Sequence, residues 1–122
     1  MIIDQSTIAG KWEVLWASIP FRGRALPICF QVFRYEDIRA DPEGSQNKLE
    51  DQFVRKVVAM LPEALRPLLL FDRGYARVPL LRLLDSLQVY YVIRVRQDVV
   101  VRHGDRHNGP LSGVSVGRGA LL

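Results

Sequence analysis

Three extended apolar segments follow one another at the start of the chain, and their order constrains the fold more than any other feature. They span residues 1–8, 12–21 and 25–34. In the second segment Trp12, Val14 and Trp16 fall on one face at the period of a strand, although the positions between them are partly apolar too. Short turns at Gly10 and Gly23 separate the segments. The pattern predicts a three-stranded antiparallel meander.

A change of period follows the meander. The polar residues 35–46 are predicted to form a loop, and apolar residues then recur at helical spacing from Leu49 to Val57. Asn47 is the expected N-cap of this helix, and Glu50 is placed to reach back to it. A helix is therefore predicted to pack one apolar stripe against the strands.

Strand and helix patterns then alternate. The continuous apolar run 68–71 predicts a central strand covered on both faces, and it ends abruptly at Asp72. Leucines at helical spacing predict a helix over residues 77–87, with Pro79 in its first turn. Residues 89–95 predict the next strand. The order is β-β-β-α-β-α-β, which is the element order of the ribonuclease-H-like α/β fold. That fold places the first strand beside the fourth in a mixed sheet.

The end of the chain has a different character. Residues 1–97 hold all the strong strand and helix patterns, whereas residues 98–122 are polar and rich in glycine. Apart from a possible short strand at 99–101, we predict an irregular tail without its own core. The domain division expected is therefore a core of residues 1–97 and a tail of residues 98–122.

Two aspartates interrupt the apolar strands, and they are the candidates for chemistry. Asp4 lies within the first strand and Asp72 follows the fourth. If these strands are neighbours, the two residues lie about one strand spacing apart, ~5 Å. Two carboxylates that close repel unless a cation lies between them, and Mg²⁺ suits oxygen ligands of this kind. The alternative is that each aspartate forms only local hydrogen bonds at a strand end.

Four segments of the chain carry a family resemblance. They are Ile2-Ile3-Asp4-Gln5-Ser6-Thr7-Ile8, Gly23-Arg24-Ala25-Leu26-Pro27-Ile28, Leu69-Leu70-Phe71-Asp72-Arg73-Gly74-Tyr75 and Tyr91-Val92-Ile93-Arg94-Val95-Arg96. In this order and spacing they resemble the catalytic domain of DDE transposases of the insertion-sequence-4 type. The resemblance extends from Met1 to about Gln97.

The resemblance implies a ribonuclease-H-like catalytic domain that cleaves and joins DNA strands during transposition. Asp4 and Asp72 match the first two members of the family's acidic triad and would be catalytic metal ligands. The cofactor implied is Mg²⁺, with Mn²⁺ as a substitute. The partner implied is DNA, with a homo-oligomer or pairing with a full-length transposase as further expectations.

The sequence departs from the family at the third acid. The family carries it as a glutamate in a Tyr-x2-Arg-x3-Glu-x6-Lys pattern on a later helix, and no such pattern follows residue 97. Asp98 and Asp105 are the only acids there, and both are expected in a loop. We therefore expect a truncated fragment that is inactive alone. The alternative is a non-enzymatic product that binds DNA or full-length transposase and inhibits it.

Basic residues lie near the acids in sequence. The net charge of +4 permits a polyanionic partner without requiring one. Arg73 adjoins the second aspartate, while Arg94 and Arg96 are expected to share a face of the fifth strand. We predict that these three contact DNA phosphates, because guanidinium groups bind phosphate bidentately. Arg22 and Arg24, at a turn, are weaker candidates.

The remaining reactive residues predict no second site. The single cysteine, Cys29, lies in an apolar run and is expected to be a buried, inert thiol. His103 and His107 have metal-pair spacing, but Gly104 between them argues against a helix. No apolar run approaches the ~20 residues that a membrane span needs, and no secretory signal is visible. A reducing cytoplasm is the expected location.

Overall fold

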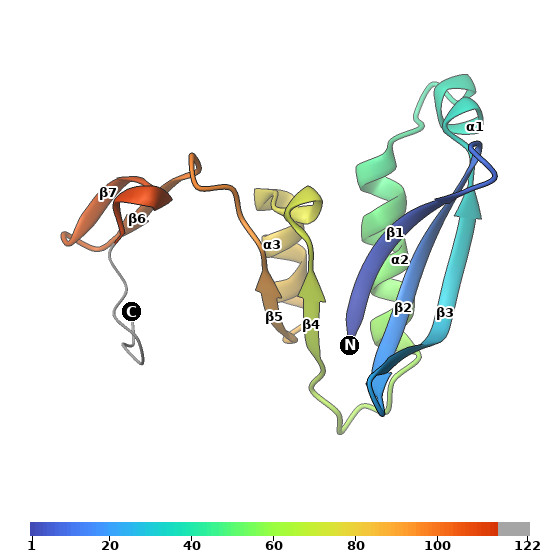
Figure 1. Ribbon diagram of the computed structural model, residues 1–122, viewed down its shortest axis with the longest axis horizontal. Helices are drawn as coiled ribbons and strands as arrows, with labels where there is room; N and C mark the ends of the chain where they lie inside the picture. The colour runs from blue at the N-terminus through green and yellow to red at the C-terminus, as the bar shows by residue number, and fades with distance from the viewer. Residues whose placement is uncertain (115–122) are drawn as a thin grey trace.

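The computed structural model describes residues 1–114, and its main feature is a five-stranded mixed sheet (Figure 1). The strands are β1 (Ile2–Ile8), β2 (Trp12–Phe21), β3 (Arg24–Phe33), β4 (Leu68–Phe71) and β5 (Tyr90–Ile93). Their order across the sheet is β3-β2-β1-β4-β5. The first three strands form the predicted antiparallel meander, whereas β4 is parallel to both β1 and β5. Strand β1 therefore lies beside β4, as the sequence predicted.

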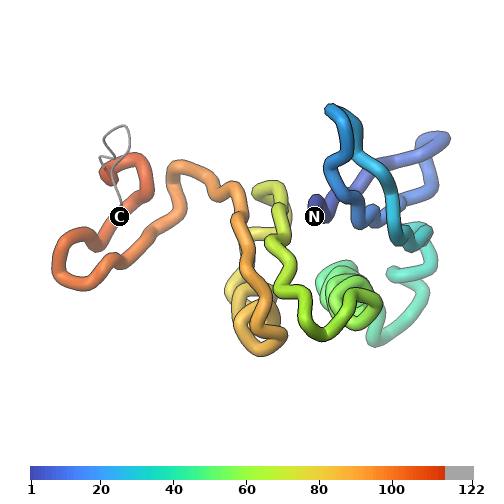
Figure 2. Tube along the Cα trace, turned by 90° about the horizontal axis from the view of Figure 1, so that it is seen from below, coloured from blue at the N-terminus to red at the C-terminus, as the bar shows by residue number. Residues whose placement is uncertain are grey.

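Two helices cover one face of this sheet. Helix α2 (Gln46–Ala59) precedes β4, and helix α3 (Val78–Ser86) joins β4 to β5. Figure 2, which looks along the strands, shows both helices on the same side of the sheet. A crossover helix of this kind is what a parallel pair of strands requires.

The hydrophobic core fills the space between the sheet and these helices. From the sheet it takes Ile3, Leu15 and Leu69, each at most 1% exposed, and from the helices Phe53 and Leu80, which are equally buried. These strand residues alternate with residues that point the other way, as the pleat of a strand dictates. The period-2 pattern of each strand therefore fixes which residues face the helices.

The opposite face of the sheet is open within the described part of the chain. Leu68 and Leu70 of β4 are 48% and 36% exposed, so the prediction that this strand is covered on both faces was wrong. Further large apolar side chains exposed on this face are Trp12, Phe30, Val32, Tyr90 and Val92. We call this surface the open face. The strand is central in the sheet, but helices cover only its other side.

The segment predicted as a loop contains an additional helix. Helix α1 (Tyr35–Ala40) begins directly after β3 and has Glu36 and Asp37 in its first turn. Carboxylates at that position interact favourably with the exposed N–H groups of a helix. Arg34 donates two hydrogen bonds to Asp37, from Nε at 3.0 Å and from Nη2 at 2.8 Å. The observed order thus differs from the predicted one by a helix between β3 and α2.

Helix α2 also begins earlier than the sequence indicated. Its first residue is Gln46 and its N-cap is Ser45, so the assignment of Asn47 as N-cap was wrong. Glu50 does not accept a hydrogen bond from the backbone of Asn47; its side chain, which is 5% exposed, instead accepts one from Gln46 Nε2. The acid that was read as a capping residue is part of the interior.

The predicted tail is not irregular throughout. Strands β6 (Val100–His103) and β7 (His107–Pro110) form a separate two-stranded antiparallel sheet, seen in red in Figure 1. Gly104 adopts a positive φ of 54° and permits the tight turn between them. The expected irregular structure of residues 115–122 lies outside the described residues. No helix in residues 1–114 is long and apolar enough to cross a bilayer.

Candidate functional site

Asp4 lies on the open face of β1. Its neighbours Ile3 and Gln5 point toward the helices, so alternation along the strand directs Asp4 away from them. Across the sheet it pairs with Trp16 of β2. Its Oδ1 accepts a hydrogen bond of 2.8 Å from the backbone N–H of Gln5. This contact orients one carboxylate oxygen and leaves the exposed carboxyl group accessible.

Asp72 lies beside Asp4, directly after the end of the neighbouring strand β4. The register of β1 with β4 pairs Ile2 with Leu70 and Ile3 with Phe71. Continuing the chain by one residue on each side brings Asp4 level with Asp72, and level residues of parallel strands point to the same face. Both aspartates line one open pocket, together with Ile2, Leu70 and Arg94 among others.

An arginine shares this pocket. Arg94 Nη1 lies 3.6 Å from Asp72 Oδ1, and the two side chains are 77% and 56% exposed. An ion pair this exposed contributes little stability, because water and salt screen it. Arg94 can therefore leave Asp72 at small cost when another cation or an anionic ligand arrives.

The donor set suits a hard divalent cation that keeps much of its water. Asp4 and Asp72 offer up to four carboxylate oxygens on one accessible surface. Mg²⁺ commonly binds through one or two carboxylates and retains several waters. Within residues 1–114 no cluster of three or more His, Cys, Asp or Glu side chains could hold a metal. The two aspartates therefore fit as a partial coordination shell.

The three arginines predicted to contact DNA come together beside the acid pair. Arg73, Arg94 and Arg96 line a second open pocket with Gln97 and Asp98. Strand β5 ends at Ile93, so Arg94 and Arg96 lie in the connection after it, whereas the sequence had placed them within the strand. Arg96 is held by Asp98 through hydrogen bonds of 2.9 Å and 2.7 Å.

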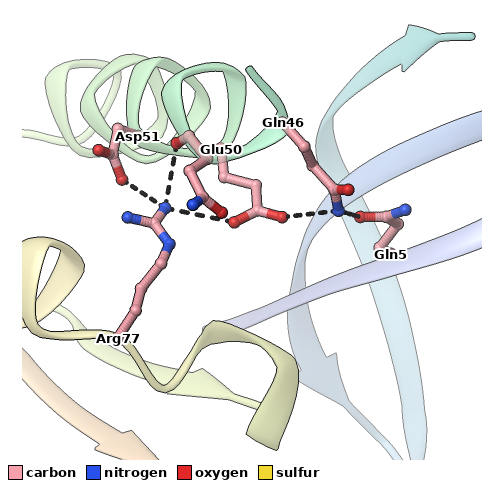
Figure 3. Close-up of polar contacts among 6 residues, drawn as sticks. Gln5, Gln46, Glu50, Asp51 and Arg77 are labelled. Carbon is pink, nitrogen blue, oxygen red and sulfur yellow. Dashed lines mark hydrogen bonds and ion pairs between the residues drawn. The ribbon is translucent and has the colours of Figure 1, made fainter. Parts of the chain in front are cut away.

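A partly buried polar network lies behind the acid pair, on the helix side of the sheet, and the sequence did not predict it (Figure 3). Gln46 Nε2 donates to Gln5 Oε1 at 3.1 Å and to Glu50 Oε1 at 3.0 Å. Arg77 Nη2 donates to Glu50 Oε2 at 3.2 Å and to Asp51 Oδ1 at 2.6 Å. We call these five residues the Glu50 network.

The Glu50 network joins three elements. Gln5 belongs to β1, while Gln46, Glu50 and Asp51 belong to α2. Arg77 is the N-cap residue of α3 and follows the turn that begins at Asp72. Its burial disfavours the charge, but hydrogen bonds and ion pairs with Asp51 and Glu50 outweigh that cost, so the pKa of Arg77 is raised. The guanidinium therefore stays charged inside the protein.

One sequence signal points to this network. Glu50 occupies the same helical stripe as Phe53, Val54 and Val57, all of which are buried. An acid on an apolar stripe requires a buried cationic or hydrogen-bonding partner. Asking which cation could reach it would have singled out Arg77, the first residue of the predicted second helix.

Tyr75 lies close to both the network and the acid pair. Its ring packs against Phe71 with 5.4 Å between centroids, and the residue is 5% exposed. Burial raises the pKa of its hydroxyl, and the negative charges of Glu50 and Asp4 raise it further. The hydroxyl has no hydrogen-bond partner among the described residues. Tyr75 is therefore a neutral core residue and not a proton donor or acceptor for the acid pair.

The other candidates lie outside this region. Cys29 is a free thiol at 9% exposure in the core, as predicted. His103 and His107 face each other across the β6–β7 turn, and His107 Nε2 lies 3.1 Å from the Pro110 carbonyl oxygen. Arg22 stacks on Phe21 in the β2–β3 turn, with 5.3 Å from its guanidinium carbon to the ring centroid.

The chain matches a model of a known protein family. Residues 38–118, more than half of the chain, match the transposase DDE domain family. The matched segment includes Asp72 and the three arginines and begins after Asp4. No curated protein and no solved structure matches the chain. The mixed five-stranded sheet fits a ribonuclease-H-like domain of this family, whose members use divalent metal ions and act on DNA. The chain belongs to the transposase DDE domain family.

Proposed function

We propose that Asp4 and Asp72 are the first two catalytic carboxylates of a transposase of the insertion-sequence-4 type. The observation that carries the proposal is their placement: Asp4 in β1 lies level with Asp72, which directly follows the parallel strand β4, and both line one pocket on the open face. The family match independently covers Asp72. In this role the two side chains hold Mg²⁺, with Mn²⁺ as a substitute.

The residues of the pocket have two different roles, metal binding and phosphate binding. Asp4 and Asp72 supply anionic oxygens at a surface open to a large substrate. Bound Mg²⁺ would polarise a phosphodiester, activate the attacking hydroxyl and neutralise charge on the leaving oxygen. Arg94 is the counter-ion of Asp72 and can turn to a DNA phosphate, because its ion pair is exposed and weak.

Arg73 and Arg96 extend the phosphate-binding surface beyond Arg94. The three guanidinium groups line the pocket next to the acids, where a DNA backbone leaving the catalytic site would pass. Guanidinium groups form paired hydrogen bonds with phosphate, and each contact adds a salt-sensitive contribution to affinity. We therefore assign backbone contacts to Arg73, Arg94 and Arg96.

We further propose that this chain holds only part of the catalytic machinery and is inactive alone. Within residues 1–114 no third acid joins Asp4 and Asp72. Asp98 is held by Arg96, and Asp105 lies in the β6–β7 turn. A third carboxylate from a later segment of a longer transposase would complete the coordination shell. The coding sequence downstream, read in all frames, tests this: a Tyr-x2-Arg-x3-Glu pattern supports it.

Metal titration tests the acid pair directly. We expect the purified chain to bind Mn²⁺, measured by electron paramagnetic resonance of the free ion. Asp4→Asn and Asp72→Asn should each weaken binding strongly while the circular dichroism spectrum is unchanged. Asp105→Asn is the matched control, since it removes an equal charge in the β6–β7 turn. Equal loss in all three variants, or in none, contradicts the proposed site.

A second candidate function rests on the open face. Its exposed apolar side chains, among them Phe30, Tyr90 and Val92, form a surface of the kind that marks protein interaction sites. A chain of this kind could pair with the full-length transposase and inhibit it, with DNA binding as a second route to inhibition. Adding the chain to an active transposase of the same element and measuring strand transfer checks this. Unchanged transfer at excess chain excludes it.

A further inference from the structure

The Glu50 network connects, through short paths, to both aspartates of the proposed site. On one side it reaches Gln5, whose backbone N–H donates to Asp4 Oδ1 at 2.8 Å. On the other side it reaches Arg77, whose backbone N–H donates to the Tyr75 carbonyl at 2.8 Å. The Tyr75 N–H donates in turn to the Asp72 carbonyl at 3.1 Å. Each path ends at a residue that would hold the metal.

The path between the two aspartates includes the ion pair of Arg77 with Glu50, which is largely buried. The side chains of Arg77 and Glu50 are 15% and 6% exposed, in contrast to the exposed pair of Arg94 with Asp72. Buried ion pairs hold a defined geometry, because separating the partners leaves a charge without solvent. The two aspartates belong to strand β1 and to the turn after β4, and the network fixes both to the first turns of α2.

The turn after Asp72 has few contacts of its own that hold it in place, so its position depends on the hydrogen bonds of Arg77. Residues 73–75 form a single 3-10 turn. The ring of Tyr75 packs on Phe71, but its hydroxyl makes no hydrogen bond among the described residues. Arg77 is thus the residue through which side-chain hydrogen bonds tie the turn to α2.

We propose that Glu50 and Arg77 are positioning residues, whose buried ion pair sets the separation and orientation of Asp4 and Asp72 for metal binding. The inference rests on the proposed function of the acid pair. Neither residue touches the metal or the DNA. They act through Gln5 on one strand and through the 72–77 turn on the other, as residues behind metal ligands do in other sites.

The test compares four variants of the full chain. Arg77→Met and Glu50→Gln remove the ion pair, and Arg77→Lys retains the charge without the fork of donors. Val57→Ala is the matched control: Val57 is buried on the same helix at 1% exposure, and its apolar side chain takes no part in the hydrogen bonds of the network. Thermal unfolding is measured for each variant. Mn²⁺ affinity is then measured at a temperature at which all of them are folded.

We expect Arg77→Met and Glu50→Gln to weaken Mn²⁺ binding about tenfold, with partial recovery in Arg77→Lys. Amide hydrogen exchange should quicken in residues 72–77. Val57→Ala should lower the unfolding temperature with wild-type Mn²⁺ affinity. If Arg77→Met does not fold, Glu50→Gln and Arg77→Lys still carry the comparison.

Two results would overturn the inference, and they differ from failure of the proposed function. If Arg77→Met and Glu50→Gln bind Mn²⁺ with wild-type affinity, the network contributes to stability alone. The same conclusion follows if Val57→Ala loses as much Mn²⁺ affinity as they do. If instead Asp72→Asn binds Mn²⁺ as tightly as the wild type, the acid pair is not the metal site. The positioning role then falls together with the proposed function.

Discussion

At the scale of single residues, the buried side chain of Tyr75 affects the stability of the interior beside the site. Its hydroxyl is buried without a partner among residues 1–114. An unpaired buried polar group costs stability, so we expect Tyr75→Phe to raise the free energy of unfolding by up to about 1 kcal/mol at neutral pH. Urea denaturation checks the change. Lower stability in the variant would mean that the hydroxyl is hydrogen bonded in solution.

The same residue predicts a response to alkaline pH. Burial raises the pKa of Tyr75 above that of a tyrosine in the unfolded chain, about 10. The free energy of unfolding therefore does not depend on this group below about pH 10. It falls as the pH rises above that value, because the hydroxyl ionises readily only in the unfolded chain. Burial and the hydrogen bond with Asp85 raise the pKa of Tyr91 in the same direction. Tyr75→Phe should reduce, but not abolish, the alkaline loss.

At the scale of elements, the β2–β3 turn is set by two residues with left-handed backbone. Arg22 and Gly23 have φ values of 48° and 76°. Two consecutive positive values suit the tight turns that match the twist of a hairpin. No atom lies within 4 Å of an added Cβ at Gly23, so only backbone strain opposes a side chain there.

We expect Gly23→Ala to lower the free energy of unfolding by about 1–2 kcal/mol, the cost of the left-handed conformation for a residue with a Cβ. Gly74→Ala is the matched control, because that glycine has open space and no positive φ. Thermal unfolding of the two variants gives the comparison. Equal unfolding temperatures would show that the turn relaxes to another conformation.

The elements that sequence predicted best are those with strong periodicity. The meander follows from its extended apolar segments and short turns, helix α2 from helical spacing, and β4 from a continuous apolar run. Asp4 and Asp72 are conspicuous because one lies within an apolar strand and the other ends one. The Glu50 network was not predicted, because it joins three separate segments: Gln5 lies 41 residues before Gln46, and Arg77 lies 27 residues after Glu50. These segments become neighbours only in the folded chain. Helix α1 was missed because a polar segment of six residues carries little hydrophobic signal.

At the scale of the whole molecule, charge predicts how the chain meets DNA. The net charge is +4, and three arginines line one pocket. We expect weak, sequence-independent DNA binding. Its affinity should fall steeply with added salt, because releasing counterions from the DNA is less favourable at high salt. Arg94→Ala should reduce the slope of log affinity against log salt by about one. Fluorescence anisotropy of a labelled duplex measures both quantities.

The control for this measurement is Arg39→Ala, an equal loss of charge on helix α1. Its slope should match the wild type if the DNA backbone follows the pocket of Arg73, Arg94 and Arg96. A slope reduced equally by both substitutions would indicate that net charge, and not this pocket, governs binding. Absence of binding at low ionic strength would remove the DNA-contact assignment altogether.

The last prediction concerns the chemistry of the chain as a whole: we expect no DNA strand cleavage or transfer by this chain alone. Asp4 and Asp72 supply two carboxylates on one face, and no third acid joins them within residues 1–114. Two-metal phosphodiester chemistry requires both ions to be held opposite the attacking and leaving oxygens. Two carboxylates leave the second ion loosely bound, and positioning carries much of the rate.

Incubation with supercoiled plasmid in Mg²⁺ and in Mn²⁺ measures this activity, and an Asp72→Ala chain purified in parallel reports contaminating nuclease. Nicking that occurs with the wild type and disappears in Asp72→Ala would contradict the prediction. An acid of this chain would then complete the shell, and Asp98 is the first to examine, because it lines the pocket beside Arg94. Releasing Asp98 from Arg96 would supply that ligand, so Asp98→Asn should abolish the nicking.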